Sequence, residues 1–328
     1  MAWRSGLGRG IAGVLLVCVL IGARAEDGTL SLLIENDSIS HTDRYYTHGI
    51  RLGWLSAPDA DRACGDRYAR WIPFLECRSD ARWVLALSQM AFSPIDLNRT
   101  VPDPADRPYA GWLNVSAGVV ARIDATLDQL ALSVGMVGPA SQGEGAQKLI
   151  HRVHGIREPR GWDYQLHNEL AIQGFYQRSA RAWRVGSNSG FGADVLPHYG
   201  GALGNVYIYA NTGGMLRVGK NLSEDFGPPR IEPGVPGSDY ANRKQHFAWY
   251  LFAGVDGRAV AHNIFLDGNT FRDSPSVERN VWVADLQVGL MIDWDPIRIG
   301  YTHVWRSREF RGQPTPQAFG AVSIAYRF

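Results

Sequence analysis

The sequence predicts an all-β protein, namely a twelve-stranded antiparallel transmembrane β-barrel with a short helix in an extracellular loop. Two observations support this fold class. Apolar and polar side chains alternate along many separate runs of the chain, and tryptophans stand at both ends of the apolar face in the clearest run. The composition agrees, because 37 glycines, 11 tryptophans and an aromatic content of 11% suit a barrel with aromatic girdles.

The N-terminal residues 1–25 predict a secretory signal peptide. Arg4 and Arg9 precede a short apolar run, which ends in the small-residue pattern Ala23-Arg24-Ala25. The alternative, a membrane anchor, needs a longer apolar run than this one. Cleavage after Ala25 would leave residues 26–328 as a single barrel domain. Since no later stretch approaches about 20 apolar residues, the mature chain is either soluble and secreted or crosses a membrane as strands.

A polar break interrupts the first predicted hairpin, ENDSISHTDRYYTHGIRLGW (residues 35–54). Asn36 and Asp37 end its first strand and Thr47 begins its second, so the hairpin brings the three residues close together. Amide, carboxylate and hydroxyl oxygens, together with backbone carbonyls, are hard ligands that suit Ca²⁺ rather than Zn²⁺. The alternative is an Asx-rich turn that closes the hairpin without a metal.

Cysteine and charge content set two further expectations. Cys18 would leave with the signal peptide, so Cys64 and Cys77 remain as an even pair in an oxidising compartment, and we expect a disulfide between them. The formal net charge is +1, which gives no electrostatic reason to expect nucleic acid as a partner.

The segment EGAQKLIHRVHG departs from strand periodicity and predicts a helix. Its leucine, isoleucine and valine make one apolar stripe, whereas Gln147, His151 and His154 fall on the opposing face. Gly155 is a suitable stop. Such a helix can pack on the rim of a barrel and form one wall of a cleft. The alternative is a loop helix whose polar face is simply solvated.

The C-terminal strands are the clearest of the chain. QAFGAVSIAYRF alternates strictly and ends at Phe328, and a final amphipathic strand ending in Phe resembles the assembly signal of bacterial outer-membrane barrels. VWVADLQVGLMIDW brackets its apolar face with Trp282 and Trp294 and places charges on the other face, which a soluble sandwich would not usually do. Counting such runs gives about twelve strands. Their expected centres are Leu32, Ile50, Leu87, Val115, Leu132, Ile172, Val195, Tyr209, Leu251, Leu286, Tyr301 and Ser323.

This strand order also predicts which loops face outside. With the N-terminus in the periplasm, the loops after the first, third and fifth strands are extracellular, and the cysteine pair is periplasmic. The extracellular segments are then Ser38–Tyr46, Asp96–Pro108 and Gly138–Gln165.

Three segments together resemble the hallmark motifs of the outer-membrane lipid A deacylase family. They are the first hairpin, DRPYAGW (Asp106–Trp112) and HRVHGIREPRGWDYQLHNE (His151–Glu169), in this order along the chain. Three separated motifs in register are far more specific than any one of them, and the resemblance covers essentially the whole mature chain. It implies a twelve-stranded barrel and a Ca²⁺-dependent ester hydrolase that removes the 3′-linked acyloxyacyl group from lipid A.

The resemblance assigns roles to particular residues. Asn36, Asp37 and Thr47 match the family's Asn-Asp pair and threonine, and His151 matches its essential histidine. His154 has no counterpart. The chain departs from the family pattern near Arg157 and Glu158. A carboxylate that assists the histidine is expected one position away from where Glu158 stands. The implied catalytic residues are therefore His151, Gln147, Thr47, Asn36 and Asp37, and the implied metal ligands are Asp37, Asn36 and Thr47.

The implied chemistry is direct attack by water. His151 would take the proton of the water, and Ca²⁺ would stabilise the oxyanion. The chain has no G-x-S-x-G elbow. The phosphates of lipid A would meet arginines of the outer loops, for which we expect Arg44, Arg99 and Arg107, with Arg160 as a further candidate. The expected partners are lipid A and outer-membrane lipid, and we expect a monomer whose active site faces outside.

Two other functions fit part of this pattern. A non-enzymatic barrel, either a channel or a structural protein, explains the strands but gives the oxygen cluster and the loop helix no purpose. An outer-membrane phospholipase needs a serine paired with a histidine on the barrel exterior, and the sequence suggests no obvious pair.

Overall fold

The computed structural model describes most of the predicted barrel. The signal peptide, Arg44, Cys64 and Cys77 lie outside the described residues, so the cleavage site, this arginine's role and the disulfide stay predictions. The described residues are 28–37, 45–58, 80–186, 190–222, 224–231, 241–242 and 246–328.

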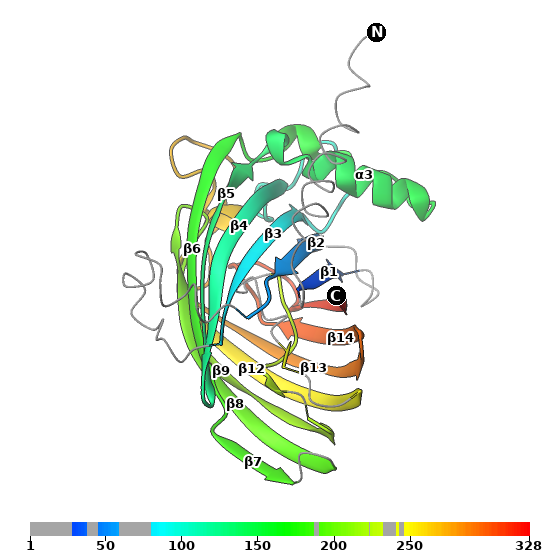
Figure 1. Ribbon diagram of the computed structural model, residues 1–328. Coiled ribbons are helices and arrows are strands. Elements are labelled where there is room, and N and C mark those ends of the chain that lie inside the picture. Colours follow the sequence, from blue (N-terminus) through cyan, green and yellow to red (C-terminus); the bar gives the residue numbers. More distant parts are fainter. Residues whose placement is uncertain are drawn as a thin grey trace.

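Twelve long strands form a closed antiparallel barrel (Figure 1). Each pairs with its neighbour along the chain, the first pairs with the last, and β6 pairs with β8 to complete the ring. All twelve expected centres lie in separate strands, which confirms the predicted fold class. The strands are β1 (Thr29–Asn36), β2 (Tyr45–Leu55), β3 (Asp80–Ser93), β4 (Ala110–Ile123), β5 (Thr126–Val137), β6 (Glu169–Ala180), β8 (Phe191–Gly204), β9 (Tyr207–Lys220), β12 (Phe247–Asn263), β13 (Trp282–Trp294), β14 (Ile297–Arg306) and β15 (Gln317–Arg327).

Shorter elements decorate the two ends. The end at which β1, β3 and β5 finish is called the helix end, because the predicted helix, α3 (Gly143–Val153), lies across it (Figure 1). At the opposite end the two described termini meet, where Phe328 N donates to Gly28 O at 3.0 Å. The remaining elements are η3 (Pro139–Ser141), η4 (Trp162–Tyr164), β7 (Trp183–Gly186), β10 (Glu224–Asp225), β11 (Ala241–Asn242) and α4 (Ile264–Asp267).

The alternation in the sequence becomes an outer and an inner surface. In β13, Trp282 and Trp294 are exposed on the outer wall, whereas Asp285 and Asp293 are buried on the inner side. Outward apolar side chains suit lipid, and inward charges need partners inside the barrel. None of the described helices has the length and apolarity that a membrane crossing demands.

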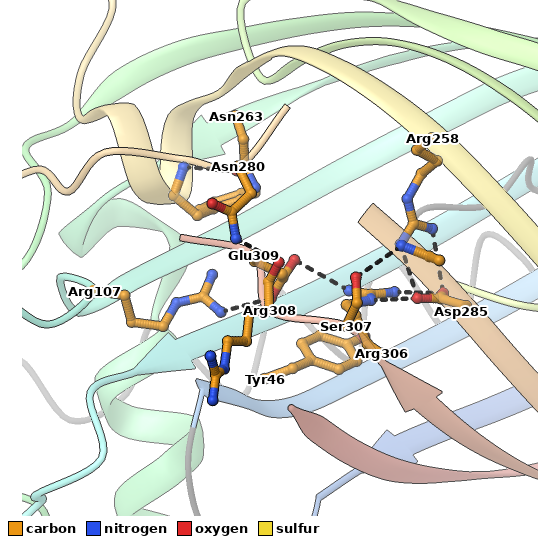
Figure 2. A network of polar contacts seen from close by, with 12 residues as sticks. Tyr46, Arg107, Arg258, Asn263, Asn280, Asp285, Arg306, Ser307, Arg308 and Glu309 are labelled. Atoms are coloured by element: carbon orange, nitrogen blue, oxygen red, sulfur yellow. Dashed lines mark hydrogen bonds and ion pairs between the residues drawn. The ribbon is translucent and has the colours of Figure 1, made fainter. Parts of the chain in front are cut away.

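The interior near the helix end is filled by aromatic side chains and then by ion pairs. Phe265 of α4 is fully buried and stacks on Phe92 of β3, with ring centroids 4.1 Å apart. Arg107 lies over the Phe92 ring and begins a chain of ion pairs. Glu309 pairs with both Arg107 and Arg306, and Arg306 pairs in turn with Asp285 (Figure 2).

The segment 224–231 occupies the middle of the lumen. Ile231 N donates to Glu35 Oε1 at 2.9 Å, and Arg230 pairs with Asp285 at 2.9 Å. Phe226 packs against buried residues of β2–β5 and also against those of β8–β13, which lie on opposite sides of the barrel. This segment, called the lumen plug below, therefore bridges the two walls.

Candidate active site

α3 lies against the outer wall of the barrel, over β3 and β4. The close approach requires glycine, because a Cβ on Gly111 of β4 would lie 2.1 Å from Ser141 Oγ and 3.1 Å from Gly143 Cα. Gln89 of β3 adds a tie by donating from Nε2 to Ser141 O at 2.7 Å. The loops that follow β3 and β5 are joined as well, since Arg160 N donates to Leu97 O at 3.0 Å.

The buried face of α3 is its polar face. Gly143, Gln147 and His151 are buried at a spacing of four residues, whereas Leu149 and Val153 are 57% and 74% exposed. A soluble loop helix would bury the apolar stripe instead. The helix therefore holds an amide and an imidazole between itself and the barrel wall.

A backbone carbonyl orients the imidazole of His151, which is 3% exposed. Its Nδ1 lies 2.7 Å from Arg157 O, and a carbonyl oxygen can only accept a hydrogen bond. Nδ1 therefore carries a proton, and in the neutral tautomer the lone pair belongs to Nε2. Glu158, the carboxylate near this position, is engaged elsewhere, because it pairs with Arg152 at 2.9 Å on the exposed side of the helix.

The amide of Gln147 is fully buried and is also held by a specific partner. Trp162 of η4 donates from Nε1 to Gln147 Oε1 at 2.7 Å. Trp162 is itself buried, and its ring lies 4.9 Å from that of Tyr109 in the DRPYAGW segment. The second and third motifs therefore meet around this glutamine.

The first hairpin ends on the same outer wall. Asn36 pairs in register with His48, and both share a face with the exposed Ile34 and Ile50. Against β3, a bulge makes Thr47 the extra residue between Tyr46 and His48. Bulges commonly redirect a side chain beside an active site.

Two of the hard-oxygen residues of this hairpin lie in buried positions where its strands meet the loop. Asp37, at the end of β1, is 1% exposed, and Thr47 Oγ1 lies 2.6 Å from Ser93 Oγ. Carboxylate, amide and hydroxyl oxygens suit Ca²⁺ chemically. The described residues contain no cluster of three or more His, Cys, Asp or Glu side chains that could hold a metal, so the Ca²⁺ site stays a prediction.

His48 links the two walls of the candidate site. It is 1% exposed and close enough to His151 for the two rings to interact electrostatically. Because His48 stands opposite Asn36 and next to Thr47, this interaction brings the helix histidine beside the first hairpin.

Comparison with known proteins assigns the chain to a family. Residues 11–328 match the model of a family described as outer membrane protein LpxR. The chain belongs to the LpxR family. The resemblance drawn from the three motifs is thereby confirmed, and so is an outer-membrane location for the barrel.

One solved structure shows the same fold. LpxR from Salmonella typhimurium has 19% sequence identity and a TM-score of 0.75, and the alignment covers 92% of this chain and 100% of that chain. More distant barrels include the β-domain of the Bordetella autotransporter BrkA (10% identity, 92% and 98% of the two chains, TM-score 0.42) and the translocator domain of NalP from Neisseria meningitidis (10% identity, 98% and 96%, TM-score 0.38). No curated protein sequence matches the chain.

Two of the arginines expected to bind phosphate in this LpxR family member, Arg107 and Arg99, differ in how exposed they are. Arg107 is 1% exposed, pairs with Glu309 at 3.2 Å and lies over the Phe92 ring inside the barrel. A buried guanidinium cannot reach a substrate on the outer wall, so the structure contradicts the expected substrate contact of Arg107. Arg99 is half-exposed and pairs with Asp103 at 3.1 Å.

A surface groove beside α3 gathers other cations. It measures about 640 Å³ and is lined by Lys148, Arg157 and Arg160, together with Glu158, Pro159 and Thr100, the last from the loop after β3. Arg160 was a sequence candidate, whereas Lys148 and Arg157 were not. His48 and Trp162 were also missed. His48 lies in the THG triplet and Trp162 in the RGW triplet. Only the tertiary structure shows that these two residues lie beside His151 and Gln147.

Proposed function

We propose that the protein is a lipid A 3′-O-deacylase, an outer-membrane ester hydrolase that removes the 3′-linked acyloxyacyl group. The observation that supports this most strongly is the setting of His151: a buried imidazole with an oriented lone pair, held on the outer wall of a lipid-facing barrel beside the first hairpin. Membership of the LpxR family supports the same substrate.

The position on the outer wall suits an amphiphilic substrate. Ile34, Ile50 and Val115 are exposed on strands below the site, so acyl chains could lie along them while the ester enters from the side. The cationic groove of Lys148, Arg157 and Arg160 would take the phosphates of the sugar headgroup. Arg99 borders this region, and Arg44 stays a candidate. In this proposal the helix end faces the outside of the cell.

The reaction needs one base that later acts as an acid. Nε2 of His151 would take a proton from water, and the hydroxide would form a bond to the ester carbonyl carbon. When the tetrahedral intermediate collapses, the bond to the sugar oxygen breaks and His151 returns the proton to that oxygen. The products are a free acyloxyacyl acid and a sugar hydroxyl group, with no covalent enzyme intermediate.

Calcium is the cofactor that fits the first hairpin. Asp37, Asn36 and Thr47 would hold it through oxygen donors, completed by neighbouring hairpin residues. When bound there, Ca²⁺ would supply positive charge that stabilises the developing oxyanion. Removal with EDTA should abolish turnover, and added Ca²⁺ should restore it better than Mg²⁺, which is a smaller ion and requires a stricter octahedral set of ligands.

The deciding experiment is mass spectrometry of lipid A from cells with and without the protein. We expect loss of the 3′-linked acyloxyacyl group with the wild-type protein and an unchanged lipid A with His151→Ala. His154→Ala is the matched control, because His154 directly follows α3 and contacts Ile150 O at 2.9 Å on the exposed side. Heat-modifiable migration of each variant shows that the barrel is folded. Full deacylation by His151→Ala would refute the proposal.

A further inference from the structure

Trp162 fixes the orientation of the Gln147 amide. An indole N–H can only donate, so the atom that it faces at 2.7 Å must be the amide oxygen. This contact removes the usual ambiguity between the oxygen and nitrogen of a glutamine side chain. Tyr109 and Gly143 hold the indole ring in turn: the Tyr109 ring centroid is 4.9 Å away, and a Cβ on Gly143 would lie 3.1 Å from Trp162 Cη2.

The other end of the same amide is a buried donor. Gln147 is 0% exposed, and within the described residues its Nε2 has no hydrogen-bond partner. A buried amide donor without a partner is unfavourable, and in native structures such a group calls for an explanation. Trp162 bonds the oxygen of this amide, so the two N–H groups of Nε2 are the part of the side chain still able to bind another molecule.

The donor lies in the candidate active site. Gln147 stands one helical turn before His151, and both side chains are buried on the face of α3 that meets β3 and β4. We infer that Gln147 donates from Nε2 to the carbonyl oxygen of the reacting ester and that Trp162 is the positioning residue that keeps this donor in place. The inference rests on the proposed ester hydrolysis.

The expected kinetic signature follows from where charge develops. The carbonyl oxygen gains negative charge in the tetrahedral intermediate, so a fixed N–H donor stabilises the transition state more than the bound substrate. Loss of the donor should therefore lower kcat and leave KM nearly unchanged. A residue needed only for packing would not produce this separation.

The test is a double-mutant cycle on lipid A turnover by the full-length protein in detergent. Gln147→Met should lower kcat about 100-fold, the usual effect of removing one such donor. Trp162→Phe keeps an aromatic ring but removes the N–H, and we expect kcat to fall about 10-fold with KM within about twofold. In the Gln147→Met background, Trp162→Phe should have no further effect, because there is no amide left to orient.

Controls separate the inference from packing and from the proposed function. Trp294→Phe, at a 72% exposed position on the outer wall, should behave as wild type. If Trp162→Phe fails to fold, Gln147→Glu still tests the donor: its carboxylate can accept from the indole but cannot donate, and kcat should fall at least as far as in Gln147→Met. An unchanged kcat in Trp162→Phe, or an equal loss in both backgrounds, would overturn the inference alone. A wild-type protein that does not hydrolyse lipid A would overturn the proposed function, and the inference with it.

Discussion

At the scale of single residues, a backbone carbonyl, that of Arg157, orients the buried imidazole of His151. The spacing of Gln147 and His151 predicts one helical face, and the structure places both on the buried face. No residue pattern predicts that the Arg157 carbonyl orients His151, because every residue has a carbonyl and only the turn after the helix brings this one into range. The expected carboxylate, Glu158, points to Arg152 instead.

Glu158 should therefore be dispensable for the chemical step. We expect Glu158→Gln to keep kcat within about twofold, since an exposed ion pair contributes little and the Arg157 carbonyl still holds the imidazole. A partner that orients a catalytic histidine would cost roughly 10- to 100-fold when removed, by analogy with partners of metal-bound histidines. Steady-state turnover of lipid A by the purified variant distinguishes the two cases.

Arg107 shows a different limit of sequence reasoning. From sequence alone, an arginine in an outer loop looks the same whether its side chain binds substrate or points into the barrel. Arg107 points into the barrel and pairs with Glu309. Arg107→Met should lower the free energy of unfolding by about 2 kcal/mol, because Glu309 loses one of its two cationic partners and keeps only Arg306. The double variant with Glu309→Gln should recover part of this loss. Urea unfolding in lipid vesicles measures both, and a raised KM for lipid A with unchanged stability would contradict this assignment.

At the scale of elements, the strands were predictable and α3 was predictable only in part. A barrel strand has an alternating pattern with lipid on one side, so β13 could be assigned from its own residues. The amphipathic pattern of α3 was clear too, but it does not say which face meets the protein. The structure exposes Leu149, Val153 and Ile156 and buries the polar stripe.

The exposed apolar face of α3 should rest in the outer leaflet of the membrane. Val153→Asp would place a charge in that layer, so we expect lipid A turnover in membrane vesicles to fall about threefold or more. Turnover in detergent should change less, because a micelle rearranges around a charge more readily than a packed leaflet. Arg152→Gln, at the adjacent exposed position, is the matched control. An equal loss in both media would mean that Val153 serves the fold rather than the membrane contact.

At the scale of the whole molecule, the twelve-stranded barrel followed from counting strands, but the content of its lumen did not. Inward charges such as Asp285 predict a polar interior, whether a water-filled channel or a packed core. Which of these forms depends on register and on distant segments. Here Arg230, Arg258 and Arg306 converge on Asp285, and the lumen plug adds Phe226 between the walls.

This filled interior argues against a channel, and a conductance measurement tests that conclusion. In the cavity lined by Phe226 and Arg230, the centres of water molecules are confined to about 70 Å³, which is room for only a handful of waters. We expect the wild-type protein to show no steady conductance in a planar bilayer. Replacing both Phe226 and Arg230 with alanine should loosen the plug and produce opening events, whereas Trp294→Phe on the outer wall should stay silent. A stable ion current through the wild-type protein would mean that the lumen plug leaves the lumen. A polar substrate could then pass through the barrel, and the proposed binding on the outer wall would lose this support.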